Sequence, residues 1–236
     1  MAGRRPLRRD DRPMTLGILM LDTDFPRIPG DVGNPATWPF PVRISVVRDA
    51  SPKRVVRERA EGLVDAFVAA GLKLAAEGAV AIITTCGFLA LHQHRIAARL
   101  PVPFASSSLL QLPMLARVLP AGRRPGVITI DAGALTRAHF LAAGADPETP
   151  TVGMESGGEF ARTFLGNRST LDALAAEREI LAAGRRLVAQ HPEVGAVVLE
   201  CANMPPYAAA LRACLRLPVY DMRSFGRWLY SGRSPD

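Results

Sequence analysis

Two cysteines, Cys86 and Cys201, stand in matching settings in the two halves of the chain. Each follows a short apolar run, precedes a helical stretch and is followed further on by R-L-P-V, which opens another short strand. The two positions are 201 − 86 = 115 residues apart, about half of the 236-residue chain. This repetition predicts two similar α/β units, each with a cysteine at the carboxyl end of a parallel strand, where ligands bind.

Thiols on two sides of a bound molecule suit proton transfer at carbon. One thiolate removes a proton from a carbon next to a carboxylate, and the other thiol delivers a proton to the opposite face, which inverts the centre. A thiol has a reference pKa of about 8.5, so the thiolate needs stabilisation, which backbone amides at helix N-termini supply. A cysteine that ends a buried strand is also a common small hydrophobe, but the repeated placement favours function. Cys214 lies among Ala and Leu in a predicted helix and is interpreted as core packing.

Short runs rich in Val and Ile alternate with longer segments of helical period, which is typical of parallel sheets with crossover helices. We expect helices along the apolar stripe from Val56 to Leu74 and over Ser169–Gln190, with Ser169 and Thr170 as possible caps. The predicted strands, all expected to be buried, are Leu16–Leu21, Ala79–Thr85, Val102–Ala105, Gly126–Ile130, Gly195–Glu200 and Leu217–Tyr220.

The expected fold class is α/β, with two similar parallel-sheet halves related by pseudo-twofold symmetry and the active site in the cleft between them. Residues 14–105 and 216–236 are expected to form the first half, with Cys86, and residues 106–215 the second, with Cys201. Residues 1–13 are expected to be a disordered basic tail. The Pro- and Gly-rich loop over residues 23–41 is either a lid or binding loop, or a surface excursion held by its aromatic residues.

The net charge of +7 is concentrated at the N-terminus, where five arginines and two aspartates give residues 1–12 a net charge of +3. The other arginines are scattered beside carboxylates, so we expect no nucleic-acid partner. No apolar run approaches the roughly 20 residues that span a bilayer, and no signal peptide is evident, so we expect a cytoplasmic protein without a membrane partner. The three widely spaced cysteines indicate neither a disulfide framework nor a zinc site. No metal is expected, since His92 and His94 lie on different faces of a helix.

With these motifs, the chain resembles the cofactor-independent aspartate/glutamate racemase superfamily, which includes hydantoin racemases, maleate isomerases and arylmalonate decarboxylases. The resemblance covers most of the chain from Met14 onward. It rests on T-T-C-G-F around Cys86, L-E-C-A-N-M around Cys201, L-D-T after the first predicted strand and the two-half arrangement. It implies a small carboxylate-bearing substrate, catalysis without pyridoxal phosphate, metal or other cofactor, and a homo-oligomer, most commonly a dimer.

Position by position, the resemblance implies that Cys86 and Cys201 are the acid/base thiols. Asp22 and Thr23 match the polar pair that follows the first strand in glutamate racemases. Thr85 and Asn203, beside the cysteines, are candidate contacts to a substrate carboxylate. Gly87 completes the predicted substrate-binding set. The serines 106–108 could line the cleft, but they are expected to cap the next helix.

The leading expectation is a racemase or epimerase, an isomerase that acts on an amino acid or a related small molecule. The alternatives are an isomerase or decarboxylase of the same superfamily, or a non-catalytic protein that binds small carboxylates. Two cysteines argue against the decarboxylases, which need one proton-delivering thiol. The substrate stays open, because Gly87-Phe88 and Glu200 replace the Cys-Asn-Thr and Gly-Cys-Thr neighbourhoods of amino-acid racemases.

Overall fold

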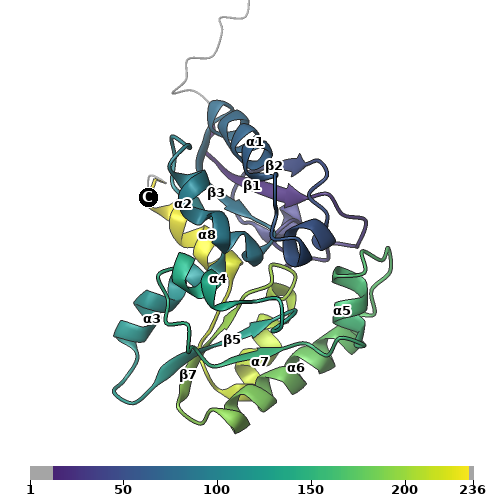
Figure 1. The fold of residues 1–236 in the computed structure, drawn as a ribbon, viewed down its shortest axis with the longest axis vertical. Coiled ribbons are helices and arrows are strands. Elements are labelled where there is room, and N and C mark those ends of the chain that lie inside the picture. The colour runs from purple at the N-terminus through teal and green to yellow at the C-terminus, as the bar shows by residue number, and fades with distance from the viewer. Residues whose placement is uncertain (1–12, 234–236) are drawn as a thin grey trace, which may run out of the picture.

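Two four-stranded parallel sheets form the framework of the protein in a computed structural model that describes residues 13–233 (Figure 1). The first sheet has the order β2-β1-β3-β4 and the second the order β6-β5-β7-β8, so the same pattern occurs twice. This confirms the predicted α/β class with two parallel sheets. The predicted basic tail lies outside the described residues except for Pro13. The strands are β1 (Thr15–Leu21), β2 (Val42–Val47), β3 (Ala79–Thr84), β4 (Phe104–Ala105), β5 (Arg124–Thr129), β6 (Thr151–Gly153), β7 (Val194–Leu199) and β8 (Val219–Tyr220).

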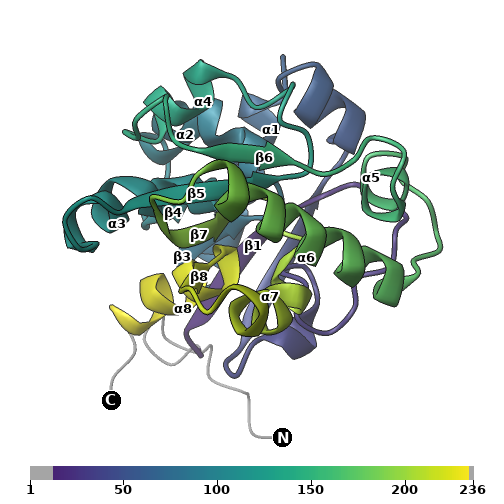
Figure 2. The same ribbon diagram turned by 90° about the horizontal axis from the view of Figure 1, so that it is seen from below.

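Helices cover both sheets, as the crossover connections between parallel strands require (Figure 2). The α-helices are α1 (Val64–Ala76), α2 (Gln93–Ala97), α3 (Leu112–Val118), α4 (Arg137–Ala142), α5 (Glu159–Phe164), α6 (Ala173–Gln190), α7 (Ala208–Leu215) and α8 (Met222–Ser231). The shorter helical turns are η2 (Pro35–Thr37), η3 (Lys53–Arg57), η4 (Gly87–His92), η5 (Ser108–Gln111) and η6 (Pro205–Tyr207).

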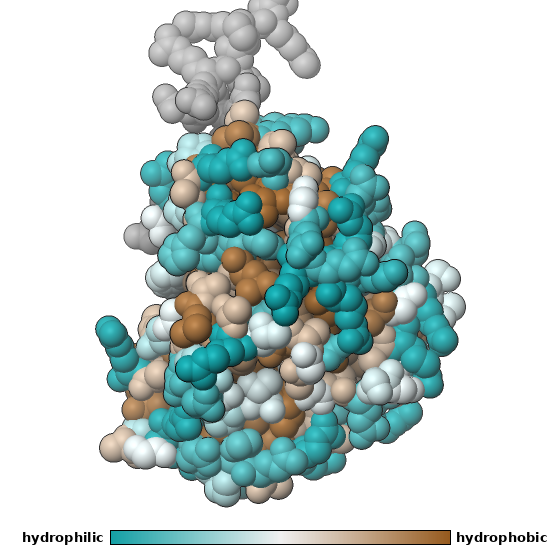
Figure 3. All heavy atoms as spheres, viewed as in Figure 1, coloured by the Kyte–Doolittle hydropathy of each residue, from teal (hydrophilic) through white to brown (hydrophobic). Residues whose placement is uncertain are grey.

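The strands that lead to the two cysteines lie at the centre of the core. Every residue of β3 and of β7 is buried, as the apolar sequences of these strands predict. On the face shown in Figure 3, hydrophilic residues dominate and apolar residues show in patches between them. None of the helices in the described part of the chain combines the length and apolar character needed to cross a membrane. Because β3 and β7 are fully buried, they hold the turns that carry Cys86 and Cys201 in place.

The C-terminal segment is shared between the two halves. β8 pairs with β7, with Val197 opposite Val219, so it belongs to the second sheet. α8 then returns to pack against β3 and β1 of the first sheet, as Figure 1 shows. The expected boundary, which placed all of residues 216–236 in the first half, therefore differs from the structure over β8. The parallel pairing of the Val219 strand with β7 accounts for the difference.

The first predicted helix is interrupted. The apolar stripe from Val56 to Leu74 is divided between η3 and α1, because Arg59 and Ala60 adopt positive φ angles of 53° and Gly62 one of 73°. The second predicted helix is confirmed as α6, but its cap is Asp172, which accepts a hydrogen bond from the Ala175 amide, and not Ser169 or Thr170. Ser107 caps η5 by accepting from the Leu109 amide, which confirms the capping role expected of the serines.

Candidate active site

Both repeated cysteines line one cavity between the two sheets. Cys86 follows β3 and precedes η4, whereas Cys201 follows β7. The cavity has a volume of about 30 Å³, roughly that of one water molecule. Its described lining residues are mostly apolar: Leu21, Phe25, Pro52, Val56, Thr85, Cys86, Gly87, Phe88, Ile130, Phe164, Leu165, Glu200, Cys201 and Asn203. The sequence repeat therefore brings the two thiols to one site.

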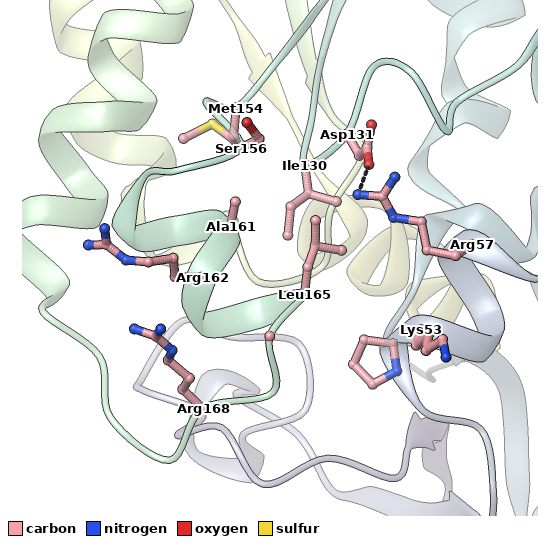
Figure 4. Close-up of a pocket in the computed structure, with 12 residues that line it drawn as sticks. Lys53, Arg57, Ile130, Asp131, Met154, Ser156, Ala161, Arg162, Leu165 and Arg168 are labelled. Atoms are coloured by element: carbon pink, nitrogen blue, oxygen red, sulfur yellow. Dashed lines mark ion pairs between the residues drawn. The ribbon is translucent and has the colours of Figure 1, made fainter.

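A larger, open cleft of about 720 Å³ adjoins this cavity and shares Pro52, Ile130 and Leu165 with it. Figure 4 shows the cleft between η3 on one side and α5 with the chain after it on the other. Arg57 of η3 forms a 2.7 Å ion pair across it with Asp131, which follows β5. The cleft is rich in positive charge, since its other charged residues are Lys53, Arg162 and Arg168.

The environment of Cys86 favours the neutral thiol. Burial raises the pKa of the Cys86 thiol, and the negative charge of Glu200 raises it further. Two groups act in the opposite direction, because the backbone N–H of Phe88 and the guanidinium of Arg27 favour the thiolate. A charge change near Glu200 would therefore alter how easily Cys86 loses its proton.

Cys201 is held by a chain of polar contacts that leads into the 23–41 loop. Its Sγ donates to Oδ1 of Asn203 at 3.4 Å, and Nδ2 of Asn203 donates to Oδ2 of Asp31 at 2.6 Å. Oδ1 of Asp31 in turn accepts from Arg27 at 2.9 Å and from the Gly33 amide at 2.7 Å. Burial, followed by the charge of Glu200, raises the pKa of the Cys201 thiol, and Asp31 adds to this effect. Cys201 is thus fixed as a proton-bearing thiol.

Glu200 lies between the two cysteine-bearing turns. It immediately precedes Cys201, and a Cβ on Gly87 would overlap its Oε1, so the glycine beside Cys86 makes room for this carboxylate. Oε2 accepts a 2.8 Å hydrogen bond from the Thr129 hydroxyl, but Oε1 has no hydrogen-bond partner among the described residues. Burial raises the pKa of Glu200 to about 7. The site therefore contains an acid that titrates near neutral pH.

The structure brings together five of the seven predicted site residues. Cys86, Cys201, Thr85, Gly87 and Asn203 all line the cavity.

Asp22 and Thr23 do not line the cavity in the structure. The exposed Asp22 follows β1, where its amide donates to Ala50. The Thr23 hydroxyl accepts a 3.2 Å hydrogen bond from Arg27, so it supports the loop. Their predicted contact with the substrate stays a prediction.

Sequence reasoning missed the roles of Asp31, Glu200 and Thr129. Asp31 lies in the 23–41 loop, which packs against the site: Phe25 lines the cavity, and the Val32 amide donates to the Ala202 carbonyl at 3.3 Å. The binding-loop interpretation is thus better supported than a surface excursion. For Glu200, the sequence signal was an acid directly before a cysteine in L-E-C-A-N-M. For Asp31 there was no local signal, because its partner Asn203 is 172 residues away in the chain.

Solved structures with a similar fold come from enzymes with two related chemistries. Arylmalonate decarboxylase matches with a TM-score of 0.62 and 15% identity, over 93% of this chain and 94% of that chain. Allantoin racemase from Klebsiella pneumoniae matches with a TM-score of 0.63 and 16% identity, over 92% of this chain and 86% of that chain. The protein shares the fold of these enzymes. This confirms the resemblance at the level of the racemase fold, and no family model matches the sequence.

Curated proteins with similar sequences carry a different functional name. Dimethylsulfoniopropionate lyase 7 of Emiliania huxleyi is 28% identical in an alignment of 218 residues that covers 88% of this chain and 63% of that protein. Dimethylsulfoniopropionate lyase 5 of the same organism is 29% identical over 87% of this chain and 43% of that protein. A dimethylsulfoniopropionate lyase of Durusdinium sp. clade D is 27% identical over 88% of this chain and 71% of that protein.

These relatives correct the leading functional expectation. The chain spans 63% of the length of the first of them and 43% of the second. The racemase and isomerase interpretation is overturned, because relatives that match most of this chain are named lyases. The racemase-fold structures are more distant, at 15–16% identity. The alternative of a lyase within the same superfamily fits these findings better.

Proposed function

We propose that the protein is a cofactor-independent lyase that eliminates a leaving group from the carbon β to a carboxylate. Dimethylsulfoniopropionate, named for its relatives, is the first candidate substrate. A base removes a proton from the carbon next to the carboxylate, and the electrons of that C–H bond form the carbon–carbon double bond. The C–S bond breaks with its electron pair on sulfur. The products are acrylate, neutral dimethyl sulfide and the proton held by the base.

The observation that carries this proposal is that Cys86 and Cys201 line one apolar cavity. Proton abstraction next to a carboxylate is a step that eliminations and racemisations share, so the same pair of thiols can serve a lyase. An apolar cavity strengthens electrostatic effects on the developing negative charge and excludes water.

The surroundings of the two thiols divide their roles. Cys86 is the better base, because Arg27 favours its thiolate whereas the charge of Asp31 opposes the thiolate of Cys201. A backbone N–H, that of Phe88 or of Asn203, favours the thiolate at both positions. Cys201 keeps its proton, since it donates to Asn203 and also experiences the charge of Asp31. Its thiol is then available to donate to the substrate as negative charge develops on the carboxylate.

The test is to incubate the purified full chain with dimethylsulfoniopropionate, measuring dimethyl sulfide in the headspace and acrylate by NMR. We expect both products in equal amounts. Cys86→Ser and Cys201→Ser should each lower the rate by about 100-fold or more, as expected for loss of a general acid or base.

Cys214→Ser is the matched control, because this third cysteine lies in α7 and is not part of the described cavity lining. It should keep nearly wild-type activity. Elimination that continues at the wild-type rate in both Cys86→Ser and Cys201→Ser would refute the assignment of the site. Absence of both products with the wild-type chain would refute the proposed activity on this substrate.

We further propose that the protein acts as a cytoplasmic homodimer. Three free cysteines support a reducing compartment. The exposed Trp228 on α8, which stacks on Phe225 with a ring separation of 5.7 Å, offers an apolar contact for a second copy. Light scattering after size-exclusion chromatography tests the dimer, and a single monomer peak at micromolar concentration would exclude it.

A further inference from the structure

The Glu200 carboxylate is buried, and it has no cationic partner among the residues that the structure describes. The residue is 1% exposed, and its one side-chain hydrogen bond in the described structure comes from the neutral Thr129 hydroxyl. Among the described residues that line the cavity, none is a lysine or an arginine. A buried carboxylate is costly unless it is paired, so a cation next to Glu200 would be stabilising.

The free oxygen of Glu200 is available to a ligand. Oε1 is the atom without a hydrogen-bond partner, and Glu200 lines the same cavity as both thiols. The Thr129 hydroxyl fixes the other oxygen, and the absence of a side chain on Gly87 makes room for Oε1 itself. The carboxylate is therefore held in place, with one oxygen still free for a cation.

The rest of the lining selects the kind of cation. Three phenylalanines, Phe25, Phe88 and Phe164, line the cavity with aliphatic residues such as Ile130. A primary ammonium group carries three N–H donors and would leave donors unsatisfied in such surroundings. A dimethylsulfonium or trimethylammonium group has no N–H donors, and its positive charge is attracted by aromatic rings and by a carboxylate.

We infer that Glu200 binds the cationic group of the substrate, and that the site takes carboxylates that carry a methylated onium group at the β carbon. This inference rests on the proposed elimination, because the onium group next to Glu200 is then the leaving group. Glu200 supplies a negative charge for the cationic group of the substrate, which a neutral thiol cannot do.

The same placement connects substrate binding to the reactivity of the thiols. The charge of Glu200 is one of the causes that raise the pKa of Cys86 and of Cys201, after burial. A cation beside Glu200 offsets that charge and makes the Cys86 thiolate easier to form. It also favours the ionised carboxylate, so binding at neutral pH should release a proton into solution.

The experiment compares two ligands of nearly the same shape that differ in charge. One is β-trimethylammonio propionate and the other is its carbon isostere 4,4-dimethylpentanoate, in which an uncharged carbon replaces the cationic nitrogen. Calorimetry on the wild-type chain should show that the onium ligand binds about tenfold or more tightly, as expected for a close buried charge pair. In Glu200→Gln this preference should fall to about threefold or less, mainly through weaker binding of the onium ligand.

Proton release gives a second measurement that does not depend on a variant. Titrations of the wild-type chain near pH 7 in two buffers with different ionisation enthalpies should show proton release with the onium ligand and none with the isostere. A preference that is unchanged in Glu200→Gln would overturn the inference, as would failure of the wild-type chain to bind the onium ligand at millimolar concentration. Loss of turnover in Glu200→Gln with the preference intact would assign Glu200 to acid/base chemistry instead.

These outcomes separate the inference from the proposed function. An onium preference that depends on Glu200, in a chain that forms no acrylate, would support the inference and refute the lyase. Acrylate formation with no effect of Glu200→Gln on ligand preference would support the lyase and refute the inference.

Discussion

At the scale of single residues, Glu200 makes the stability of the protein depend on pH. Its pKa rises from 4.5 to about 7 on burial, so the folded protein holds this proton more tightly than the unfolded chain. Between these values the unfolded chain releases the proton first, and stability falls as the pH rises. This group alone should lower the free energy of unfolding by about 3 kcal/mol between acidic and mildly alkaline pH.

Glu200→Gln should therefore stabilise the protein at pH 8 and have little effect at pH 4.5. Glutamine keeps the shape and the hydrogen bond from Thr129 but carries no buried charge. Denaturant unfolding of the wild-type chain and the variant at both pH values measures the difference. An equal effect of the substitution at the two pH values would show that the buried carboxylate does not titrate as described.

The second residue-scale prediction concerns Asp31, which positions Cys201 through Asn203. Asp31→Ala removes the acceptor of the 2.6 Å bond from Asn203 and leaves the mostly buried Arg27 without its ion-pair partner. We expect a loss of about 3 kcal/mol in the free energy of unfolding. We also expect kcat to fall more than the affinity for substrate, because the thiol is displaced while the cavity remains.

Asp22→Ala is the control for Asp31→Ala, since Asp22 lies nine residues earlier in the chain and is exposed. It should leave both stability and activity nearly unchanged. Unfolding curves and steady-state kinetics of the two variants compare a predicted site residue with one that only the structure reveals. Equal kinetic effects would restore the role that the family resemblance assigned to Asp22.

At the scale of elements, the 23–41 loop is fastened to the chain between α5 and α6. The Asp24 amide donates to Oδ1 of Asn167 at 2.9 Å, and Nδ2 of Asn167 donates to Oδ2 of Asp24 at 2.9 Å. The rings of Phe25 and Phe164 also contact each other edge to face, with their centres 4.9 Å apart. Because the cavity holds about 30 Å³, these elements must separate to admit a substrate.

Asn167→Gly should remove the two hydrogen bonds between Asp24 and Asn167 without straining the backbone. Asn167 has a φ of 51°, a left-handed conformation that glycine adopts readily. Loss of two hydrogen bonds should raise the rate at which iodoacetamide alkylates Cys86 by about tenfold, measured by peptide mass spectrometry. The partly exposed Cys214 is the internal control and should react at an unchanged rate. Unchanged alkylation of Cys86 would show that the contact between Asp24 and Asn167 does not control the access of small molecules to this thiol.

Local sequence patterns predicted the buried elements better than the edges. The central strands β1, β3, β5 and β7 follow from their apolar runs, because strands covered on both faces have no polar alternation. β2 was missed, since V-R-I-S-V-V is an edge strand with half-exposed residues. β6 was also missed, since T-V-G contains one buried apolar residue and no apolar run. The thiol pair followed from the repeat, but the Glu200–Thr129 contact joins residues 71 positions apart and depends on how strands β5 and β7 pair.

At the scale of the whole molecule, charge is arranged along the route to the thiols. The outer cleft carries Lys53, Arg57, Arg162 and Arg168 against Asp131, whereas the inner cavity has the carboxylate of Glu200. A substrate with a carboxylate at one end and an onium group at the other fits this arrangement in one orientation, with the carboxylate toward the cleft. The outer cleft and the inner cavity thus differ in the sign of their charge.

Arg168 tests this arrangement because its side chain forms no ion pair within the described residues and is free to attract an anion. Arg168→Gln should raise KM for carboxylate ligands by about threefold at low ionic strength, and the effect should vanish in about 0.5 M salt because exposed charges are screened. Arg185→Gln makes the same charge change on an exposed position of α6 that does not line the cleft. Equal effects of the two substitutions would mean that net charge, and not the cleft, attracts the substrate. A salt-dependent effect confined to Arg168→Gln, with the onium preference unchanged, would assign the cleft to the carboxylate and leave the cation to Glu200.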